Sequence, residues 1–110
     1  MIMAAIDFNK ELFDIHVNDE NIPVLVDFWA PWCVYCRRIA PALNILAGNY
    51  KDQLLIAKVN IDDEPDLAAK EQIEVIPTLV IYKGGQALAS IVAPESKAQI
   101  EAFIKESLNL

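Results

Sequence analysis

Apolar and polar positions follow two different periods along this chain, and these periods predict its helices and strands. Apolar residues spaced by three or four positions are typical of an amphipathic helix, whereas alternation or a short apolar run is typical of a strand. Helical spacing occurs at 7–17, in the segment that follows Cys33, and from Ser96 onward, and a short helix is expected after 62–65. Strand patterns occur at 3–6, 23–29, 54–62, 79–82 and 87–92. The predicted order is therefore β-α-β-α-β-α-β-β-α.

The connections between these segments predict a mixed sheet. Lys83-Gly84-Gly85-Gln86 is typical of a tight hairpin turn, so the last two strands are expected to run antiparallel. The earlier strands are separated by helical segments and are expected to run parallel. We predict an α/β fold with helices on both faces of a central mixed sheet, formed by a single domain over residues 1–110. The first helix is expected to be capped by Asp7 or Asn9, and the strand at 3–6 to lie at the edge of the sheet.

Two charged residues interrupt strands that are otherwise apolar. Asp27 lies in the run 23–29, which has the composition of a central strand covered on both faces. Burial disfavours an ionised carboxylate, so we expect the pKa of Asp27 to be raised unless the position faces solvent. Lys58 lies in the middle of the strand at 54–62, opposite in phase to Ala57 and Val59. It is interpreted either as an outward-facing lysine or as a positive charge near Asp27.

The two cysteines of the chain, Cys33 and Cys36, stand at the predicted start of the helix that follows the strand 23–29. The free N–H groups and positive dipole of a helix start favour a thiolate, so Cys33 is the expected nucleophile. As an N-cap, its sulfur would accept hydrogen bonds from the N–H groups of Tyr35 and Cys36. Cys36, one turn deeper, is the expected resolving thiol. The alternatives are a structural disulfide or part of a zinc site, but the single histidine, His16, lies in a different predicted helix.

Composition and charge exclude several classes of function. The net charge of −7 provides no basic surface that would release counterions from nucleic acid or bind an anionic membrane. No apolar run approaches the roughly 20 residues that span a bilayer. Residues 1–9 carry no basic and apolar export pattern. We therefore expect a cytoplasmic protein with no nucleic-acid or membrane partner, in a compartment where a close cysteine pair is more often catalytic than structural.

Motifs spread over nearly the whole chain resemble those of the thioredoxin family. They are Val26-Asp27-Phe28-Trp29-Ala30, Trp32-Cys33 with Cys36, Ile39-Ala40-Pro41, Lys58-Val59-Asn60, Ile76-Pro77-Thr78 and Gly85. The resemblance implies the thioredoxin fold, with four to five strands in its mixed sheet. It also implies that Cys33 attacks, that Cys36 resolves, and that Asp27 takes the proton of Cys36 through water, with Lys58 nearby.

The same resemblance implies a substrate groove and a set of partners. A cis bond between Ile76 and Pro77 is expected to face the cysteines, and the groove beside them is expected to involve Trp32, Val34, Tyr35, Val75, Ile76, Pro77 and Ala93. The expected substrates are protein disulfides, and the expected electron donor is a thioredoxin reductase. No metal and no cofactor other than the Cys33–Cys36 disulfide are expected, and the chain is expected to act as a monomer.

The chain departs from the family at three places near this groove. Val34-Tyr35 stands where thioredoxins usually have Gly-Pro, Ala93 followed by Pro94 stands where they have Gly, and Glu74-Val75 replaces a basic residue and Gly. Unlike proline, Tyr35 has an N–H that can donate to the sulfur of Cys33. One such bond corresponds to a shift of about 30 mV toward the oxidising side. We therefore predict a weaker reductant than a Gly-Pro thioredoxin.

Three functions are consistent with these residues. The first is a thiol-disulfide oxidoreductase that reduces protein disulfides. The second is the same chemistry run in the oxidising or isomerising direction. The third is an interaction module that binds a partner without turnover, but such a module would need neither the cysteine pair nor Asp27 and Pro77.

Overall fold

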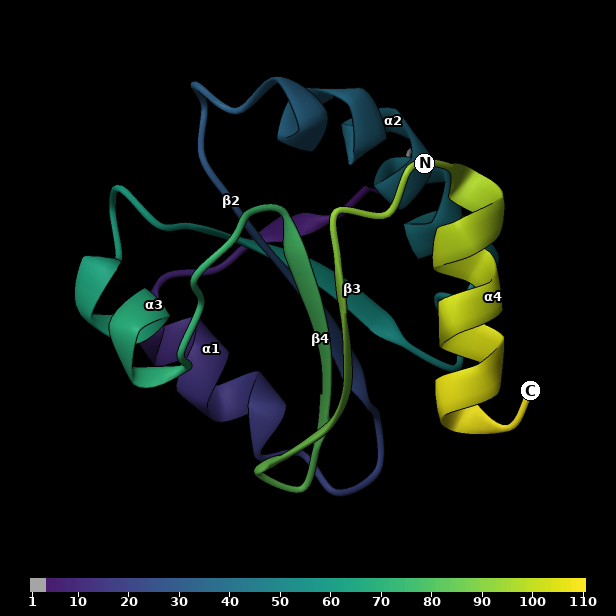
Figure 1. Cartoon of the computed structure of the whole chain (residues 1–110). Helices are drawn as coiled ribbons and strands as arrows, with labels where there is room; N and C mark the ends of the chain where they lie inside the picture. Colours follow the sequence, from purple (N-terminus) through teal and green to yellow (C-terminus); the bar gives the residue numbers. More distant parts are fainter. Residues whose placement is uncertain (1–3) are drawn as a thin grey trace.

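The computed structural model describes residues 4–110 and has the predicted order of elements. The bounds are β1 (Ile6–Asp7), α1 (Lys10–Val17), β2 (Val24–Trp29), α2 (Val34–Asn49), β3 (Leu55–Asn60), α3 (Pro65–Lys70), β4 (Thr78–Lys83), β5 (Gln86–Val92) and α4 (Lys97–Leu108). Figure 1 shows the sheet at the centre of the molecule, between α2 and α4 on one side and α1 and α3 on the other. The predicted α/β class and the mixed sheet are confirmed.

Within residues 4–110, five strands form one sheet in the order β1-β3-β2-β4-β5. The pairs β1–β3 and β2–β3 are parallel, whereas β2–β4 and β4–β5 are antiparallel. The hairpin between β4 and β5 turns at Gly84 and Gly85, whose φ angles are +60° and +82°. Glycine is required there because both central positions of this turn need a positive φ.

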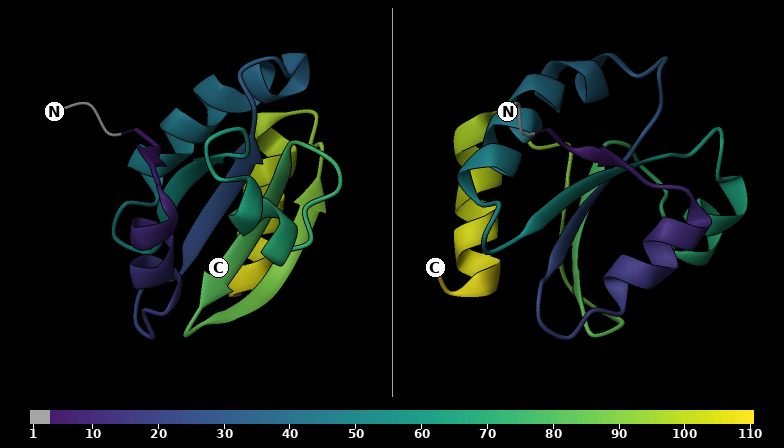
Figure 2. Two further views of the ribbon diagram at one scale, coloured as in Figure 1. Left: turned by 90° about the vertical axis from the view of Figure 1, so that its left-hand side faces the viewer. Right: turned by 180° about the vertical axis from the view of Figure 1, so that it is seen from behind.

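Each face of the sheet has its own apolar core. Leu25 and Ile56 point toward α2 and α4, and they pack with Leu43, Leu46, Ile100 and Ile104 of those helices. Val26 and Phe28 point to the other face, and they pack with Phe13 of α1 and Leu67 of α3. β2 is therefore covered on both faces, which explains why its sequence is nearly continuously apolar. Figure 2 shows the helices on the two faces from the side and from behind.

The beginning of the chain differs from the prediction. The edge strand expected at 3–6 is formed by Ile6 and Asp7, and Met3 lies outside the described residues. The first helix begins at Lys10, and its cap is Asn9, whose side chain accepts a hydrogen bond from the Leu12 N–H. Asp7 is the wrong choice of cap because its backbone is paired with Lys58 in the sheet. Across residues 4–110, no helix is long and apolar enough to cross a membrane.

Candidate active site

The cysteine pair lies where β2 leads into α2, at the carboxyl end of a parallel strand. Cys33 is the N-cap of α2, and a disulfide joins it to Cys36, with 5.2 Å between their Cα atoms. The Cys36 N–H donates to the Cys33 sulfur over 3.1 Å. This is one of the two predicted hydrogen bonds. The helix start thus holds the sulfur of Cys33 against the Cys36 N–H, at the positive end of the helix, which favours a thiolate.

The second predicted hydrogen bond, from the Tyr35 N–H to the Cys33 sulfur, is not formed in the structure of residues 4–110. Among the hydrogen bonds of residues 4–110, the side chain of Cys33 accepts only from Cys36. In the disulfide form the sulfur carries no charge, so it attracts fewer donors than a thiolate would. The Tyr35 N–H still belongs to the first turn and contributes to the positive end of α2.

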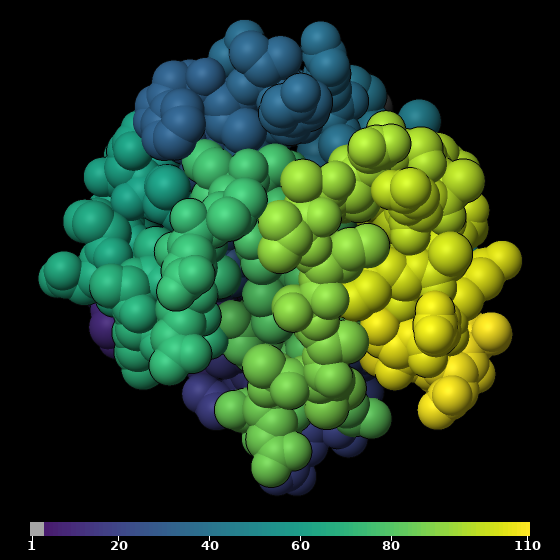
Figure 3. All heavy atoms as spheres, viewed as in Figure 1, coloured from purple at the N-terminus to yellow at the C-terminus, as the bar shows by residue number. Residues whose placement is uncertain are grey.

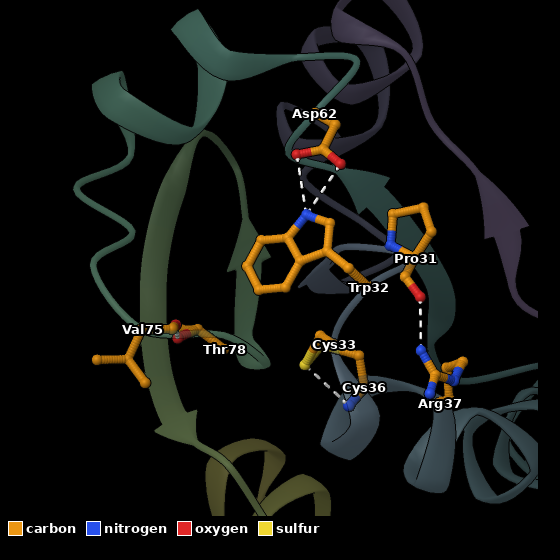
Figure 4. The surroundings of a disulfide bond; sticks show 8 residues. All are labelled: Pro31, Trp32, Cys33, Cys36, Arg37, Asp62, Val75 and Thr78. Carbon is orange, nitrogen blue, oxygen red and sulfur yellow. Dashed lines mark hydrogen bonds between the residues drawn. A yellow bond between two sulfur atoms is a disulfide. The ribbon is translucent and has the colours of Figure 1, made fainter.

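The segment that precedes β4 closes the site from the opposite side. The bond between Ile76 and Pro77 is cis, as expected from the resemblance. Ile76 packs against the small cluster formed by Ala30, Cys33 and Cys36. The Thr78 hydroxyl donates to the Val75 carbonyl, which fixes the segment across this turn. Figure 4 shows the Cys33 sulfur pointing toward Val75 and Thr78, with Trp32 beside it.

Asp27 is buried under the site in the middle of β2. It is 1% exposed, and its Oδ1 atom has no hydrogen-bond partner within residues 4–110. Asp27 lies on the same face of β2 as Leu25, which α2 covers. Burial raises the pKa of Asp27 to about 7, and the charge of Lys58 opposes this rise. The predicted raised pKa is confirmed, and the alternative of a solvent-exposed carboxylate is wrong.

Lys58 pairs with Asp27 across the parallel strands β2 and β3. Its side chain is half-buried, and its ammonium group lies 4.2 Å from the centre of the Trp29 ring. A positive charge over an indole face is attracted by the ring and loses part of its hydration. Lys58 is therefore held beside the strand of Asp27 and is not an outward-facing surface lysine.

Trp32 is highly exposed, and it is held by a residue that the sequence reasoning missed. Its Nε1–H donates to Asp62, with distances of 3.1 and 3.4 Å to the two carboxylate oxygens. Asp62 follows β3 as Trp32 follows β2, and Trp29 and Asn60 are register partners at the ends of those strands. The parallel pairing of two neighbouring strands could have indicated that the residues after them meet at one edge. Figure 4 shows the indole between Asp62 and the cysteines.

Two further predicted groove residues, Val34 and Tyr35, lie beside the cysteines on the outer surface. Val34 and Tyr35 are exposed on the first turn of α2, and the guanidinium of Arg38 lies 5.4 Å from the centre of the Tyr35 ring. A hollow of about 300 Å³ is lined by Tyr35, Arg38, Ile39, Pro94 and Glu95. The structure thus brings the Val34-Tyr35 departure close to the Ala93-Pro94 departure.

Ala93 has a backbone conformation that disfavours a side chain. Its φ angle is +46°, in the region where glycine is preferred. Its N–H donates to the Pro77 carbonyl over 2.8 Å, so the conformation is coupled to the segment that faces the cysteines. This explains why glycine suits the position and indicates that alanine is strained here.

The donor set of the site fits thiol chemistry better than metal binding. Within residues 4–110, no group of three or more His, Cys, Asp or Glu side chains is arranged to hold a metal ion. His16 stacks on Phe8, with 5.1 Å between the ring centres, far from the cysteines in the chain. The cysteine pair is joined by a disulfide instead. A reversible cysteine pair at the start of a helix, at the edge of a mixed α/β sheet, defines the class of thiol-disulfide oxidoreductases.

Comparisons with known proteins give the family. The family model described as thioredoxin matches residues 4–106. Thioredoxin M-type of the chloroplast of Chlamydomonas reinhardtii is 43% identical over 101 residues, which cover 92% of this chain and 72% of that protein. Thioredoxin 1 of Nostoc sp. is 39% identical over 105 residues, which cover 96% of this chain and 98% of that protein. The chain belongs to the thioredoxin family.

The family membership and the cysteine pair together define the activity. Thioredoxins are protein disulfide oxidoreductases that carry electrons on their own cysteine pair, without a further cofactor. This chain is a thiol-disulfide oxidoreductase whose active disulfide is Cys33–Cys36. A relative in Mycobacterium leprae, a bifunctional thioredoxin reductase/thioredoxin, is 39% identical over 97 residues, which cover 88% of this chain and 21% of that protein.

Proposed function

We propose that this chain reduces protein disulfides, with Cys33 as the attacking sulfur and Cys36 as the resolving sulfur. The Cys33 thiolate attacks one sulfur of the substrate disulfide, which forms a mixed disulfide and releases the other substrate sulfur as a thiolate. The Cys36 thiolate then attacks the Cys33 sulfur and releases the second substrate sulfur. Two electrons pass to the substrate, and the Cys33–Cys36 disulfide is formed. The hydrogen bond from Cys36 N–H to the Cys33 sulfur, over 3.1 Å at a helix start, is the observation that carries this proposal.

Asp27 is proposed as the proton acceptor for the Cys36 thiol, through water. Its pKa of about 7 suits a group that must take up and release a proton near neutral pH. Support also comes from its Oδ1 atom, which has no hydrogen-bond partner among residues 4–110 and can accept one from water. Lys58, its partner across β2 and β3, opposes the rise of that pKa and thereby keeps the carboxyl able to ionise.

The substrate is proposed to bind as an extended segment over the outer side of the cysteine pair. The residues proposed for this surface are Trp32, Val34, Tyr35, Val75, Ile76, Pro77 and Ala93. Support comes from the exposed apolar side chains of Trp32, Val34, Tyr35 and Val75, which surround the buried sulfur of Cys33. Apolar surface exposed in one place is typical of an interaction site.

The partners of the cycle are proposed from the relatives. The fusion of thioredoxin reductase and thioredoxin in Mycobacterium leprae supports a thioredoxin reductase as the electron donor. We also propose that residues 1–110 act as one domain, that the chain is a monomer, and that it works in the cytoplasm.

Reduction of insulin by dithiothreitol tests the proposed function. The chain is expected to accelerate the precipitation of reduced insulin, and the Cys33→Ser variant is expected to lose this acceleration. Cys36→Ser is expected to accumulate a covalent mixed disulfide, because attack is intact and release is not. Equal activity of the native chain and Cys33→Ser would favour an interaction module. A chain that refolds scrambled substrates but does not reduce insulin would favour the isomerising direction.

A further inference from the structure

An open groove lies over β4 and β5, on the face of the sheet that carries α1 and α3. Its floor is formed by side chains that the register places on one face, because Thr78 pairs with Val92, Val80 with Ser90, and Tyr82 with Ala87. Its wall is the segment 71–75, between α3 and β4. The groove has a volume of about 370 Å³, and a hollow between the segment 71–75 and β5 is visible in Figure 3.

The lining of this groove combines carboxylates with apolar side chains. Among residues 4–110, Glu71 and Glu74 are the charged residues that line it, and no lysine or arginine does. Glu74 is exposed, while Glu71 is half-buried and accepts a hydrogen bond of 2.6 Å from the Tyr82 hydroxyl. Glu71 is thereby bound to Tyr82, which lies near the hairpin end of β4. Glu74 precedes Val75 in the chain, so the two carboxylates line different parts of the groove. The whole chain has a net charge of −7, which reinforces the negative potential there.

The groove is continuous with the active site. Val75 and Thr78 line it, and the residue that follows Val75 in the chain, Ile76, packs on the cysteine cluster. Val75 is 53% exposed and stands between the two surfaces. A substrate chain whose sulfur reaches Cys33 can therefore continue past Val75 into the groove, next to Glu74.

We propose that this groove binds an extended segment of the disulfide-bearing substrate that carries a lysine or arginine next to apolar residues. The carboxylate of Glu74 attracts the cation, while Ile73, Val75 and Val92 accept the apolar side chains. Complementary charge at such a surface raises the rate of association and the selectivity between substrates. The inference rests on the proposed function, and it assigns to this site a preference for basic substrates.

Two matched peptides test the preference. Each carries one cysteine in a mixed disulfide with thionitrobenzoate, and the two differ only by a lysine or a glutamate. The charged residue is placed two, three or four positions from the cysteine in separate pairs of peptides. An extended chain advances roughly 3.3 Å per residue, so these positions cover a range of distances from Cys33. The dithiol form of the chain reduces each peptide to its thiol, releases thionitrobenzoate and becomes the Cys33–Cys36 disulfide. We expect the lysine peptide to react about fivefold faster at low salt in at least one position, and less than twofold faster at roughly 1 M NaCl.

Variants of Glu74 locate the effect. Glu74→Gln is expected to lower the lysine-to-glutamate rate ratio by about twofold, and Glu74→Lys is expected to reverse the preference. Glu106→Gln removes the same charge from an exposed position of α4 and is expected to leave the ratio unchanged.

Each contrary outcome has one meaning. Equal reduction of the two peptides at every position, or a ratio that Glu74→Lys leaves unchanged, would overturn the inference while the proposed function stands. An equal effect of Glu106→Gln and Glu74→Gln would show that the preference comes from the net charge of the chain, and it would contradict the proposed binding in the groove. Failure to reduce either peptide would instead contradict the proposed function.

Discussion

The inner and the outer side of the Cys33–Cys36 pair differ in what surrounds them. On the inner side, Asp27 is buried in β2, and its Oδ1 atom has no hydrogen-bond partner among residues 4–110. On the outer side, Trp32 is 64% exposed, and its indole N–H is paired with the exposed carboxylate of Asp62. The same kind of group, an aspartate, therefore has a strongly raised pKa in one place and a hydrogen-bonding role in the other. We propose from this difference that proton transfer takes place on the inner side and substrate contact on the outer side.

Replacing the inner carboxylate is expected to have the largest effect on stability. The pKa of Asp27 is about 7 in the folded chain, above its ordinary value of 3.8. The unfolded carboxyl therefore ionises at lower pH than the folded one, and the free energy of unfolding falls as pH rises from about 4 to above 7. The fall amounts to roughly 4 kcal/mol, because each pKa unit corresponds to about 1.4 kcal/mol. Urea unfolding at a series of pH values measures this fall, and the free energy of unfolding of Asp27→Asn should not show it.

Asp62→Asn is the matched control on the outer side. It makes the same chemical change at an exposed residue, and the fall in stability with pH should persist in this variant. A native chain whose stability does not change between pH 4 and pH 8, or an Asp27→Asn variant that keeps the fall, would contradict the buried state of this carboxyl.

The Val34-Tyr35 pair tests how the outer surface acts on the sulfur. Among residues 4–110, the Cys33 sulfur of the disulfide form accepts a hydrogen bond only from the Cys36 N–H, so we expect Tyr35 to act through the positive end of α2. We expect the native potential to be less reducing than that of Val34→Gly/Tyr35→Pro, by at most about 30 mV, or roughly 1.4 kcal/mol. Equilibration with glutathione measures both potentials. Equal or inverted potentials would show that Val34-Tyr35 does not make the chain a weaker reductant.

The smallest expected effect concerns Ala93. Its φ angle of +46° suits glycine, so Ala93→Gly should raise the free energy of unfolding by roughly 0.5 kcal/mol, after the entropy cost of glycine in the unfolded chain. Ala102→Gly makes the same substitution in the middle of α4, where it should destabilise the chain by about 1 kcal/mol. Thermal unfolding compares the two variants, and a loss of stability in both would show that Ala93 is not strained.

Much of the fold follows from local pattern. The strand around Asp27, the helix after Cys33 and the glycine hairpin at 83–86 each carry a periodicity or turn residues that specify one structure. The first cap was ambiguous because Asp7 and Asn9 are both good caps, and sheet pairing of Asp7 decided between them.

The site was only partly predictable, because some of its contacts join distant parts of the chain. The pairing of Trp32 with Asp62 depends on which strands are neighbours in the sheet, and pattern alone does not give the order of strands. The same holds for the contact between Ile76 and the cysteine cluster. Asp27 could be found because a charged residue is unusual in an apolar strand. The cysteines could be found because the start of a helix favours a thiolate.

Alkylation of the reduced chain as a function of pH tests the central claim most directly. With Cys36→Ser, the rate with iodoacetamide reports on Cys33 alone. Because the sulfur caps α2 and accepts a backbone N–H, the rate should reach half of its maximum at least about one pH unit below that of a cysteine in an unstructured peptide. A midpoint at or above that of the peptide, or a sulfur that reacts only on unfolding, would contradict the account.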